Sequence, residues 1–270
     1  MSSSIRQSKP QKPGSVVEVL ESKLQSSKKT KPARYDYSSE VRRPLTCLAF
    51  VAPLILWYEL GMILHTEAVR SGVDRLIEAL LSPLGPVSIG VLPLVSIGVF
   101  LFWHHRSEHP GHFHFHTLLW IALESLALAL ILFVASDAFM LYLADQRPQP
   151  LVGLTKIFTD SQQYGKLLTC LGAGIHEEIV FRLLMFAPLL RVARRFIEIE
   201  SIAVVISATI VSIVFAMAHC DVVNPEGFPF EVSTFLFRFL ASVFLCVLFR
   251  FRGIAVAIGV HAVFDILAIS

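Results

Sequence analysis

The sequence predicts an all-α integral membrane protein, with about seven (six to eight) transmembrane helices around an intramembrane polar cavity. Hydrophobic residues make up 54% of its 270 residues and the mean hydropathy is +0.66, values that are rare for a soluble domain of this size. Several apolar runs reach the roughly 18 residues that cross about 30 Å of hydrocarbon. The runs are continuous rather than alternating, which argues against a transmembrane β-barrel.

Seven predicted spans follow one another along the chain, and the sequence shows no internal repeat. Their approximate bounds are Thr46–His65, Pro86–Trp103, Thr117–Leu143, Leu167–Leu190, Ile202–His219, Phe230–Phe249 and Ile254–Ile269. Between the first two spans lies AVRSGVDRLIEALL, whose leucines and charges predict a helix at the membrane interface.

Three regions follow from this pattern: a tail over residues 1–43, N-terminal membrane helices and loops over 44–166, and a C-terminal membrane core over 167–270. The tail carries ten Lys and Arg without a sustained apolar face, which predicts a disordered cytoplasmic segment. With the N-terminus inside, the inner segments hold sixteen Lys and Arg and the outer segments five. This asymmetry indicates a cytoplasmic N-terminus.

The fourth span contains an unusual group of ionisable residues in the stretch GIHEEIVFRL, residues 174–183. A charge at the centre of a spanning helix costs about 2.5–3.5 kcal/mol on insertion scales. Glu178 and Arg182 are four residues apart, share a helix face and can pair. Adjacent positions point about 100° apart, so Glu177 is left to face a cavity.

Two later spans also bring polar groups to helical spacing. The fifth ends in FAMAHC, with Phe215 and His219 on one face, and the seventh contains HAVFD, with His261 and Asp265 on one face. Such groups normally face a bundle interior or a water-filled cavity. We therefore expect carboxylates and histidines from three helices to meet at similar depth.

Two chemistries fit these residues. A glutamate–histidine pair can take a proton from water, while a second histidine, with Asp265 orienting it or donating separately, stabilises an oxyanion. The same side chains can instead bind a catalytic zinc ion, with Glu177, His219, His261 and Asp265 as ligands. The motif HExxH is absent because Val180 stands four residues after His176, so only a zinc site between helices remains possible.

The order EExxxR, FxxxH and HxxxD on successive apolar helices resembles the CPBP family. This family comprises CAAX prenyl endopeptidases and bacteriocin-processing enzymes, and is also called the ABI family of intramembrane proteases. The resemblance covers about Leu167–Ser270 and implies peptide-bond hydrolysis, described in the family both with and without a metal. No named family resembles the N-terminal three spans or the tail.

Residue roles follow from the resemblance. Glu177 would be the water-activating base with His219, Glu178 the supporting acid, and His261 with Asp265 the oxyanion-side pair. Arg182 and Phe215 complete the motifs as supporting residues. The family often has Asn at the last position. An ionised Asp only accepts hydrogen bonds, which favours a histidine-orienting or metal-binding role for Asp265.

Structural interpretations stand beside these functional ones. The charged groups of the fourth span can form a buried ion network, and Phe215 can serve packing alone. Other ionisable groups in apolar runs are interpreted as structural, with Arg238 alternatively offsetting a cavity carboxylate; they are Glu59, Glu124, Asp137 and Arg238. The loop HHRSEHPGHFHFH is interpreted as a titratable membrane-surface loop, with metal binding as the alternative.

The leading hypothesis is a membrane-embedded endopeptidase acting on a peptide or protein segment, including a lipidated one, at the bilayer, without a nucleic-acid partner. The alternatives are a partner-binding or immunity factor that retains the fold, and a proton-coupled carrier. Charge counting places the polar cluster towards the outer face, whereas a prenyl endopeptidase should open to the cytosol. The sequence leaves that face, and the need for zinc, open.

Overall fold

The computed structural model describes residues 35–65, 70, 72–83, 88–107, 111–144, 160–220 and 229–269. Most of the predicted basic tail and of the polar loop after the third predicted span lies outside these residues. The helices described below belong to one compact unit that begins at Tyr37, ahead of the boundary at residue 44 that hydropathy indicates. The three functional regions remain a prediction.

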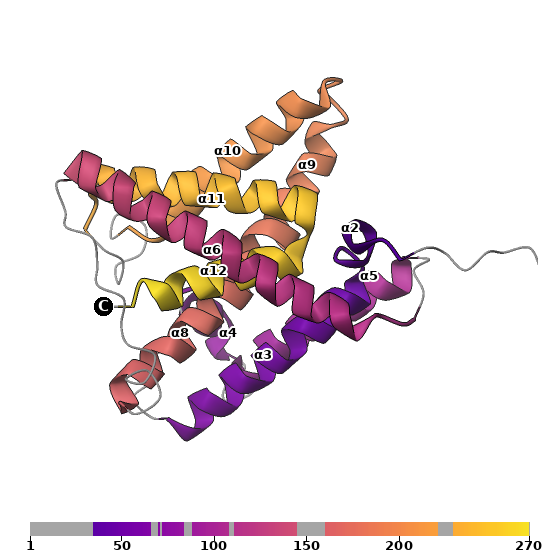
Figure 1. Cartoon of the computed structure of the whole chain (residues 1–270), viewed down its shortest axis with the longest axis horizontal. Coiled ribbons are helices and arrows are strands. Elements are labelled where there is room, and N and C mark those ends of the chain that lie inside the picture. The colour runs from indigo at the N-terminus through magenta and orange to yellow at the C-terminus, as the bar shows by residue number, and fades with distance from the viewer. Residues whose placement is uncertain are drawn as a thin grey trace, which may run out of the picture. The chain divides into compact units, whose positions relative to one another are not determined.

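The described residues form helices and connecting segments with no β-strand (Figure 1). In chain order they are α2 (Tyr37–Glu40), α3 (Pro44–Leu64), α4 (Gly72–Leu81), α5 (Ser88–Arg106), α6 (Phe115–Ala144), α8 (Ser161–Glu178), the π-helix η2 (Ile179–Phe186), α9 (Ala187–Ala193), α10 (Glu200–Ala218), α11 (Val232–Arg252) and α12 (Ile254–Leu267). The predicted all-α class is confirmed.

Four of the described helices are long and apolar enough to cross a bilayer: Pro44–Leu64, Phe115–Leu143, Glu200–Ala218 and Val232–Arg252. Shorter apolar helices cover Val91–Arg106 and Ile254–Leu267. The predicted fourth span is helical from α8 through η2 into α9. These features make the chain an integral, polytopic helical membrane protein, while the count of seven crossings stays a prediction.

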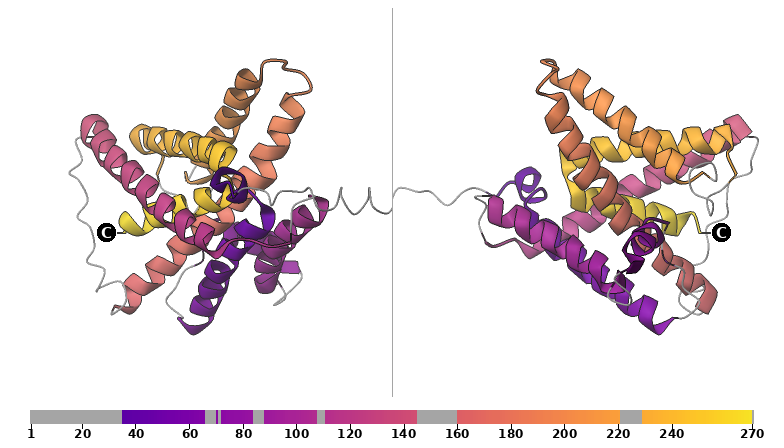
Figure 2. Two further views of the ribbon diagram at one scale, coloured as in Figure 1. Left: turned by 45° about the vertical axis from the view of Figure 1, so that its right-hand side comes forward. Right: turned by 180° about the vertical axis from the view of Figure 1, so that it is seen from behind.

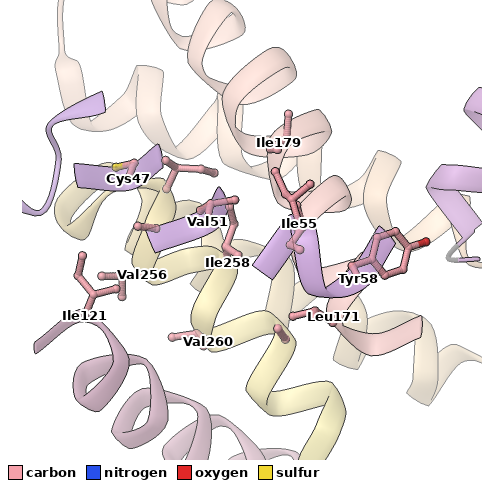
Figure 3. Close-up of a cluster of buried hydrophobic side chains, with 14 of the residues drawn as sticks. Cys47, Val51, Ile55, Tyr58, Ile121, Leu171, Ile179, Val256, Ile258 and Val260 are labelled. Carbon is pink, nitrogen blue, oxygen red and sulfur yellow. The ribbon is translucent and has the colours of Figure 1, made fainter. Parts of the chain in front are cut away.

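Helix α12 is the centre of the bundle. It packs against α8, α6, α11 and α3, and every residue from Ile254 to Ala262 is buried. A helix that is apolar all round is buried either in a protein core or in a membrane, and α12 is covered mainly by its neighbouring helices. Figure 3 shows Val256, Ile258 and Val260 of α12 within the main apolar cluster, which α3, α6 and α8 complete.

Gly253 makes the reversal between α11 and α12 possible. It is the only residue between the two helices and has φ +91°. A residue with a Cβ rarely adopts this backbone conformation. The turn therefore places α12 directly beside α11, with which it packs.

A second apolar cluster joins η2, α9, α10 and α11 and includes Phe181, Phe186 and Phe215. Helices α9 and α10 form a hairpin in both views of Figure 2. Phe181 packs edge-on against Phe215, with ring centroids 5.0 Å apart. This cluster places the end of α10, with His219, close to η2.

Two glutamates of the apolar helices have structural partners, as interpreted from the sequence. Glu124 on α6 accepts a hydrogen bond from Tyr37 at 2.6 Å and pairs with Arg252 of α11. Glu59 on α3 pairs with Arg70 at 3.3 Å. Each pair reduces the free-energy cost of placing a carboxylate among apolar side chains.

Helices α8 and α12 approach each other closely at Gly174. A Cβ at Gly174 would lie 2.7 Å from the backbone nitrogen of Ala262 and 2.8 Å from its Cα. We expect Gly174→Ala to destabilise the protein by about 1–3 kcal/mol, because backbone atoms cannot rotate away from the added methyl group. Thermal unfolding in detergent measures this effect.

Gly98→Ala is the matched control, because a Cβ at Gly98 of α5 meets no atom within 4 Å. Alanine in a helix is favoured over glycine by about 0.5–1 kcal/mol, so this variant should match or exceed the wild type in stability. Equal melting temperatures for the two variants would contradict the close approach of α8 and α12.

Candidate active site

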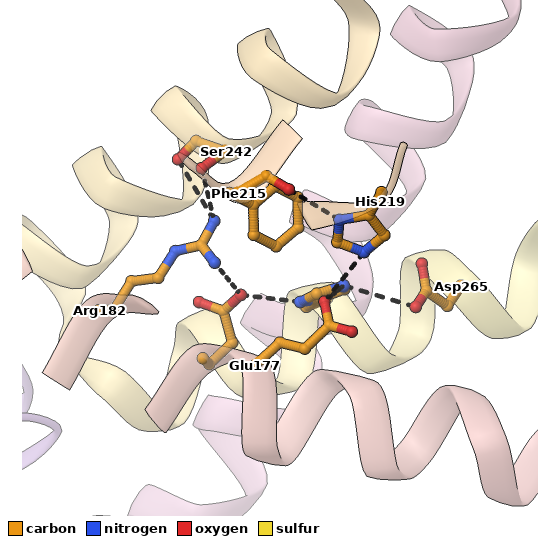
Figure 4. Close-up of polar contacts among 8 residues, drawn as sticks. Glu177, Arg182, Phe215, His219, Ser242 and Asp265 are labelled. Carbon is orange, nitrogen blue, oxygen red and sulfur yellow. Dashed lines mark hydrogen bonds and ion pairs between the residues drawn. The ribbon is translucent and has the colours of Figure 1, made fainter. Parts of the chain in front are cut away.

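The three motif segments converge on Glu177 (Figure 4). Glu177 lies in the last turn of α8, His219 directly after α10, and His261 within α12. The Glu177 Oε2 atom is 3.4 Å from His219 Nε2 and 3.9 Å from His261 Nε2. The structure thus brings together residues that are distant in the sequence, as the motifs predict.

The ring of His219 is held in one orientation by the last turn of α10. Its Nδ1 lies 2.8 Å from the carbonyl oxygen of Phe215. The imidazole ring also lies against the Phe215 ring in a tilted arrangement, with centroids 4.6 Å apart. A carbonyl oxygen only accepts, so Nδ1 must carry the hydrogen. The other nitrogen, Nε2, is therefore the one that faces Glu177.

Glu178 and Arg182 form the predicted pair, and both side chains are fully buried. The Arg182 Nη1 atom lies 2.9 Å from Glu178 Oε1, while Nη2 donates to the Ser242 hydroxyl at 3.1 Å. The guanidinium carbon lies 4.7 Å from the centre of the Phe215 ring. Arg182 therefore links η2 to three helices: to α8 by an ion pair, to α10 by a cation–π contact and to α11 by a hydrogen bond.

His261 lies between the two glutamates and Asp265. Its Nδ1 lies 2.7 Å from Glu178 Oε1, and its Nε2 lies 3.4 Å from Asp265 Oδ2. Glu178, held by Arg182, accepts the Nδ1 hydrogen, so Nε2 is the nitrogen available for chemistry. The polar contacts run without interruption from Ser242 through Arg182, Glu178 and His261 to Glu177.

The chain changes from α-helix to π-helix immediately after Glu178. Over Ile179–Phe186 the helix is wider, and the Ala187 N–H donates to the Arg182 carbonyl, five residues back. Short π-segments occur often at functional sites because they redirect side chains that an α-helix would place elsewhere. Here the π-helix carries Arg182, and no pattern in the sequence indicates it.

A cavity of about 460 Å³ opens beside these residues. Its lining includes Glu177, His219, His261 and Asp265, whereas Glu178 and Arg182 lie outside it. Apolar and small side chains from α6, α11 and α12 form most of the remaining wall, among them Phe133, Phe237 and Phe264. Glu177, the first carboxylate of EExxxR, therefore faces the cavity, whereas Glu178 is fully buried outside it.

Two further charged residues line this cavity, Asp137 of α6 and Arg238 of α11. The sequence analysis interpreted both as structural, apart from the alternative that Arg238 offsets a cavity carboxylate. Neither belongs to a motif, and only the packing of α6 and α11 against α12 brings them to the same space. The sequence itself carries no signal for this placement.

The hypothesis of a zinc site was tested against the arrangement of candidate ligands. Within the described part of the chain, no group of three or more His, Cys, Asp or Glu side chains has an arrangement that could hold a metal ion. This includes Glu177, His219, His261 and Asp265 and the described histidines near residues 104–116. The reaction proposed below is written with protein groups, and metal dependence is left to experiment.

The fold and this site define a polytopic helical membrane protein with a buried glutamate–histidine–aspartate centre. Residues 163–267 match the family model described as type II CAAX prenyl endopeptidase Rce1-like. This segment, which contains all three motifs, is therefore similar to the CAAX prenyl endopeptidases. No curated protein and no solved structure matches the chain.

Removing the Arg182 charge should destabilise the protein severely, because Glu178 would lose its principal cation. We expect Arg182→Met to lower the free energy of unfolding by about 3–5 kcal/mol, the range for breaking a buried ion pair. Ser242→Ala removes only the neutral partner of Arg182 and should cost about 1–3 kcal/mol. Unfolding in detergent compares the two, and an equal loss would contradict the dominance of the ion pair.

Proposed function

We propose that the protein is an intramembrane endopeptidase that hydrolyses a peptide bond with a water molecule activated by Glu177 and His219. The observation that carries the proposal is the convergence of Glu177, His219 and His261, from three helices, on one cavity. The family match to CAAX prenyl endopeptidases supports the same reaction class.

The first step is attack on the scissile carbonyl. A water bound on the cavity side of Glu177 Oε2 and His219 Nε2, within hydrogen-bond reach of both, gives its proton to this pair while its oxygen bonds to the carbonyl carbon. The carbonyl π electrons move to the oxygen, which becomes the oxyanion of a tetrahedral intermediate. A protonated His261 Nε2 donates a hydrogen bond to that oxyanion.

The second step breaks the carbon–nitrogen bond. The proton held by Glu177 and His219 passes to the leaving nitrogen, which departs as an amine, and the oxyanion collapses to a carboxylic acid. Asp265, which only accepts hydrogen bonds when ionised, orients His261 rather than donating to the oxyanion. Glu178 and Arg182 hold His261 from the opposite side.

The cavity indicates what kind of substrate fits. Most of its wall is apolar, and a predominantly apolar pocket with a few convergent polar groups is typical of a site that takes a ligand chain of moderate length. The proposed substrate is an extended peptide segment presented at the bilayer, with apolar side chains or a lipid group. Peptides with and without a prenyl group distinguish these two substrate classes.

The decisive experiment measures cleavage by the purified protein in liposomes, with mass spectrometry of the products. We expect Glu177→Gln to lower the turnover rate by about 10²–10⁴-fold, the usual contribution of a general base. The matched control is Glu200→Gln, the same change at an exposed carboxylate of α10. Unchanged cleavage by a folded Glu177→Gln variant would refute the assignment and leave a partner-binding factor as the better explanation.

The proposed step predicts that hydrolysis does not require a divalent metal ion. Cleavage should continue at an unchanged rate after dialysis against a chelator, because the glutamate–histidine pair itself accepts the water proton. Measuring the rate before and after dialysis, then again with added zinc, checks this. If dialysis abolished cleavage and zinc restored it, the result would contradict Glu177 as the base and favour a metal-bound hydroxide as the nucleophile.

A further inference from the structure

A second buried polar cluster lies next to the proposed active site and takes no part in the reaction described above. It comprises Tyr58 of α3, Asp74 of α4 and His176 of α8, and none of the three has any exposed surface. His176 Nδ1 lies 2.6 Å from Asp74 Oδ1, and Tyr58 donates its hydroxyl hydrogen to Asp74 Oδ2. The Tyr58 ring also packs edge-on against the imidazole of His176.

Helix α8 presents two parallel rows of side chains, each with a spacing of four residues. Thr169, Ala173 and Glu177 line the cavity. The neighbouring row faces α3 and α4: a Cβ at Gly172 would lie 2.5 Å from the Tyr58 ring, and His176 pairs with Asp74. Residues with this spacing share a helix face. His176 thus anchors the face of α8 next to the one that carries Glu177.

Helix α4 belongs to the cavity wall as well as to this cluster. Gly72 lines the cavity, and Asp74, two residues later, is buried against α8. The pair between Asp74 and His176 therefore fixes α4 to α8 within one turn of the cavity. Movement of α8 at His176 would move Glu177, which follows it directly.

Burying these polar groups costs free energy, and the loss of any one partner would leave another buried group without its contact. Replacing a buried ion pair by apolar side chains of similar volume is often neutral or stabilising, so maximal stability does not require polar groups here. The hydrogen bond from Tyr58 to Asp74 is directional, and with the close pair of Asp74 and His176 it favours one position of α8 relative to α4, where apolar packing tolerates several.

We propose that Asp74 and His176 are positioning residues for Glu177. They hold the last turn of α8 so that Glu177 Oε2 stays within reach of His219 and His261, and Tyr58 holds Asp74 from the far side. They do not touch the substrate, since neither lines the cavity. This inference rests on the proposed endopeptidase function, to which it adds a second set of required residues.

The kinetic test compares His176→Leu, which removes the polar contact, with His176→Asn, whose amide nitrogen takes a position close to that of His176 Nδ1 and can donate to Asp74. We expect His176→Leu to lower kcat by about 100-fold with KM unchanged, because a displacement of about 1 Å in a reacting group has that effect. His176→Asn should recover most of the rate. Glu124→Gln, which weakens a partly exposed pair between α6 and α11, is the control and should keep the wild-type kcat.

A second measurement does not depend on catalysis. Hydrogen exchange of peptides that cover residues 170–180 should become faster in His176→Leu and in the milder Asp74→Asn, and stay unchanged in Glu124→Gln. Unchanged exchange together with wild-type kcat in either folded variant would overturn the proposal. If the wild type cleaves no peptide, the proposed function fails, and the exchange data alone decide whether the pair positions α8.

Discussion

The pairing of buried charges is the constraint on which this structure depends. An isolated charge costs several kcal/mol when it leaves water for an apolar interior. The protein places Glu177, Glu178, Arg182 and two histidines among apolar helices, and each of them contacts a group of complementary charge or hydrogen-bonding capacity. Because the partners come from α8, η2, α10, α11 and α12, the same contacts that make burial tolerable also fix these helices relative to one another.

This pairing separates the two adjacent glutamates into different roles. Glu178 is enclosed by Arg182 and His261 and has no access to the cavity, so its charge serves to hold its neighbours. Glu177 points to the cavity, where its contacts with His219 and His261 are longer and border the open space. A short, enclosed pair stabilises the bundle, and a looser, accessible pair is available for proton transfer. The proposed reaction uses that difference.

The backbone sets the precision of the site as much as the side chains do. Gly174 lets α8 approach the backbone of α12 at Ala262, one position after His261. The π-helix begins at Ile179, directly after Glu178. The contact of His176 with Asp74 lies on the side of α8 that faces α4, away from α12. Glu177 is thus held by close helix contact on one side, polar anchoring on another and a change of helix type after it. The proposed cleavage would therefore depend on contacts well outside the residues that touch the substrate.

The sequence by itself determined the membrane-helical class, the regions that form the apolar helices, and the side chains that share a face within each helix. Hydropathy and four-residue spacing are local properties, which is why the pair of Glu178 with Arg182 could be predicted. The three motifs also led to the expectation that Glu177 meets His219 and His261. Only the tertiary structure decided the distances among them, the presence of Asp137 and Arg238 in the lining of the same cavity, and the pair of Asp74 with His176. The spacing of residues within one helix does not determine how that helix is rotated or how deep it lies relative to a neighbouring helix. Rotation and depth depend on the packing of side chains from segments far apart in the chain.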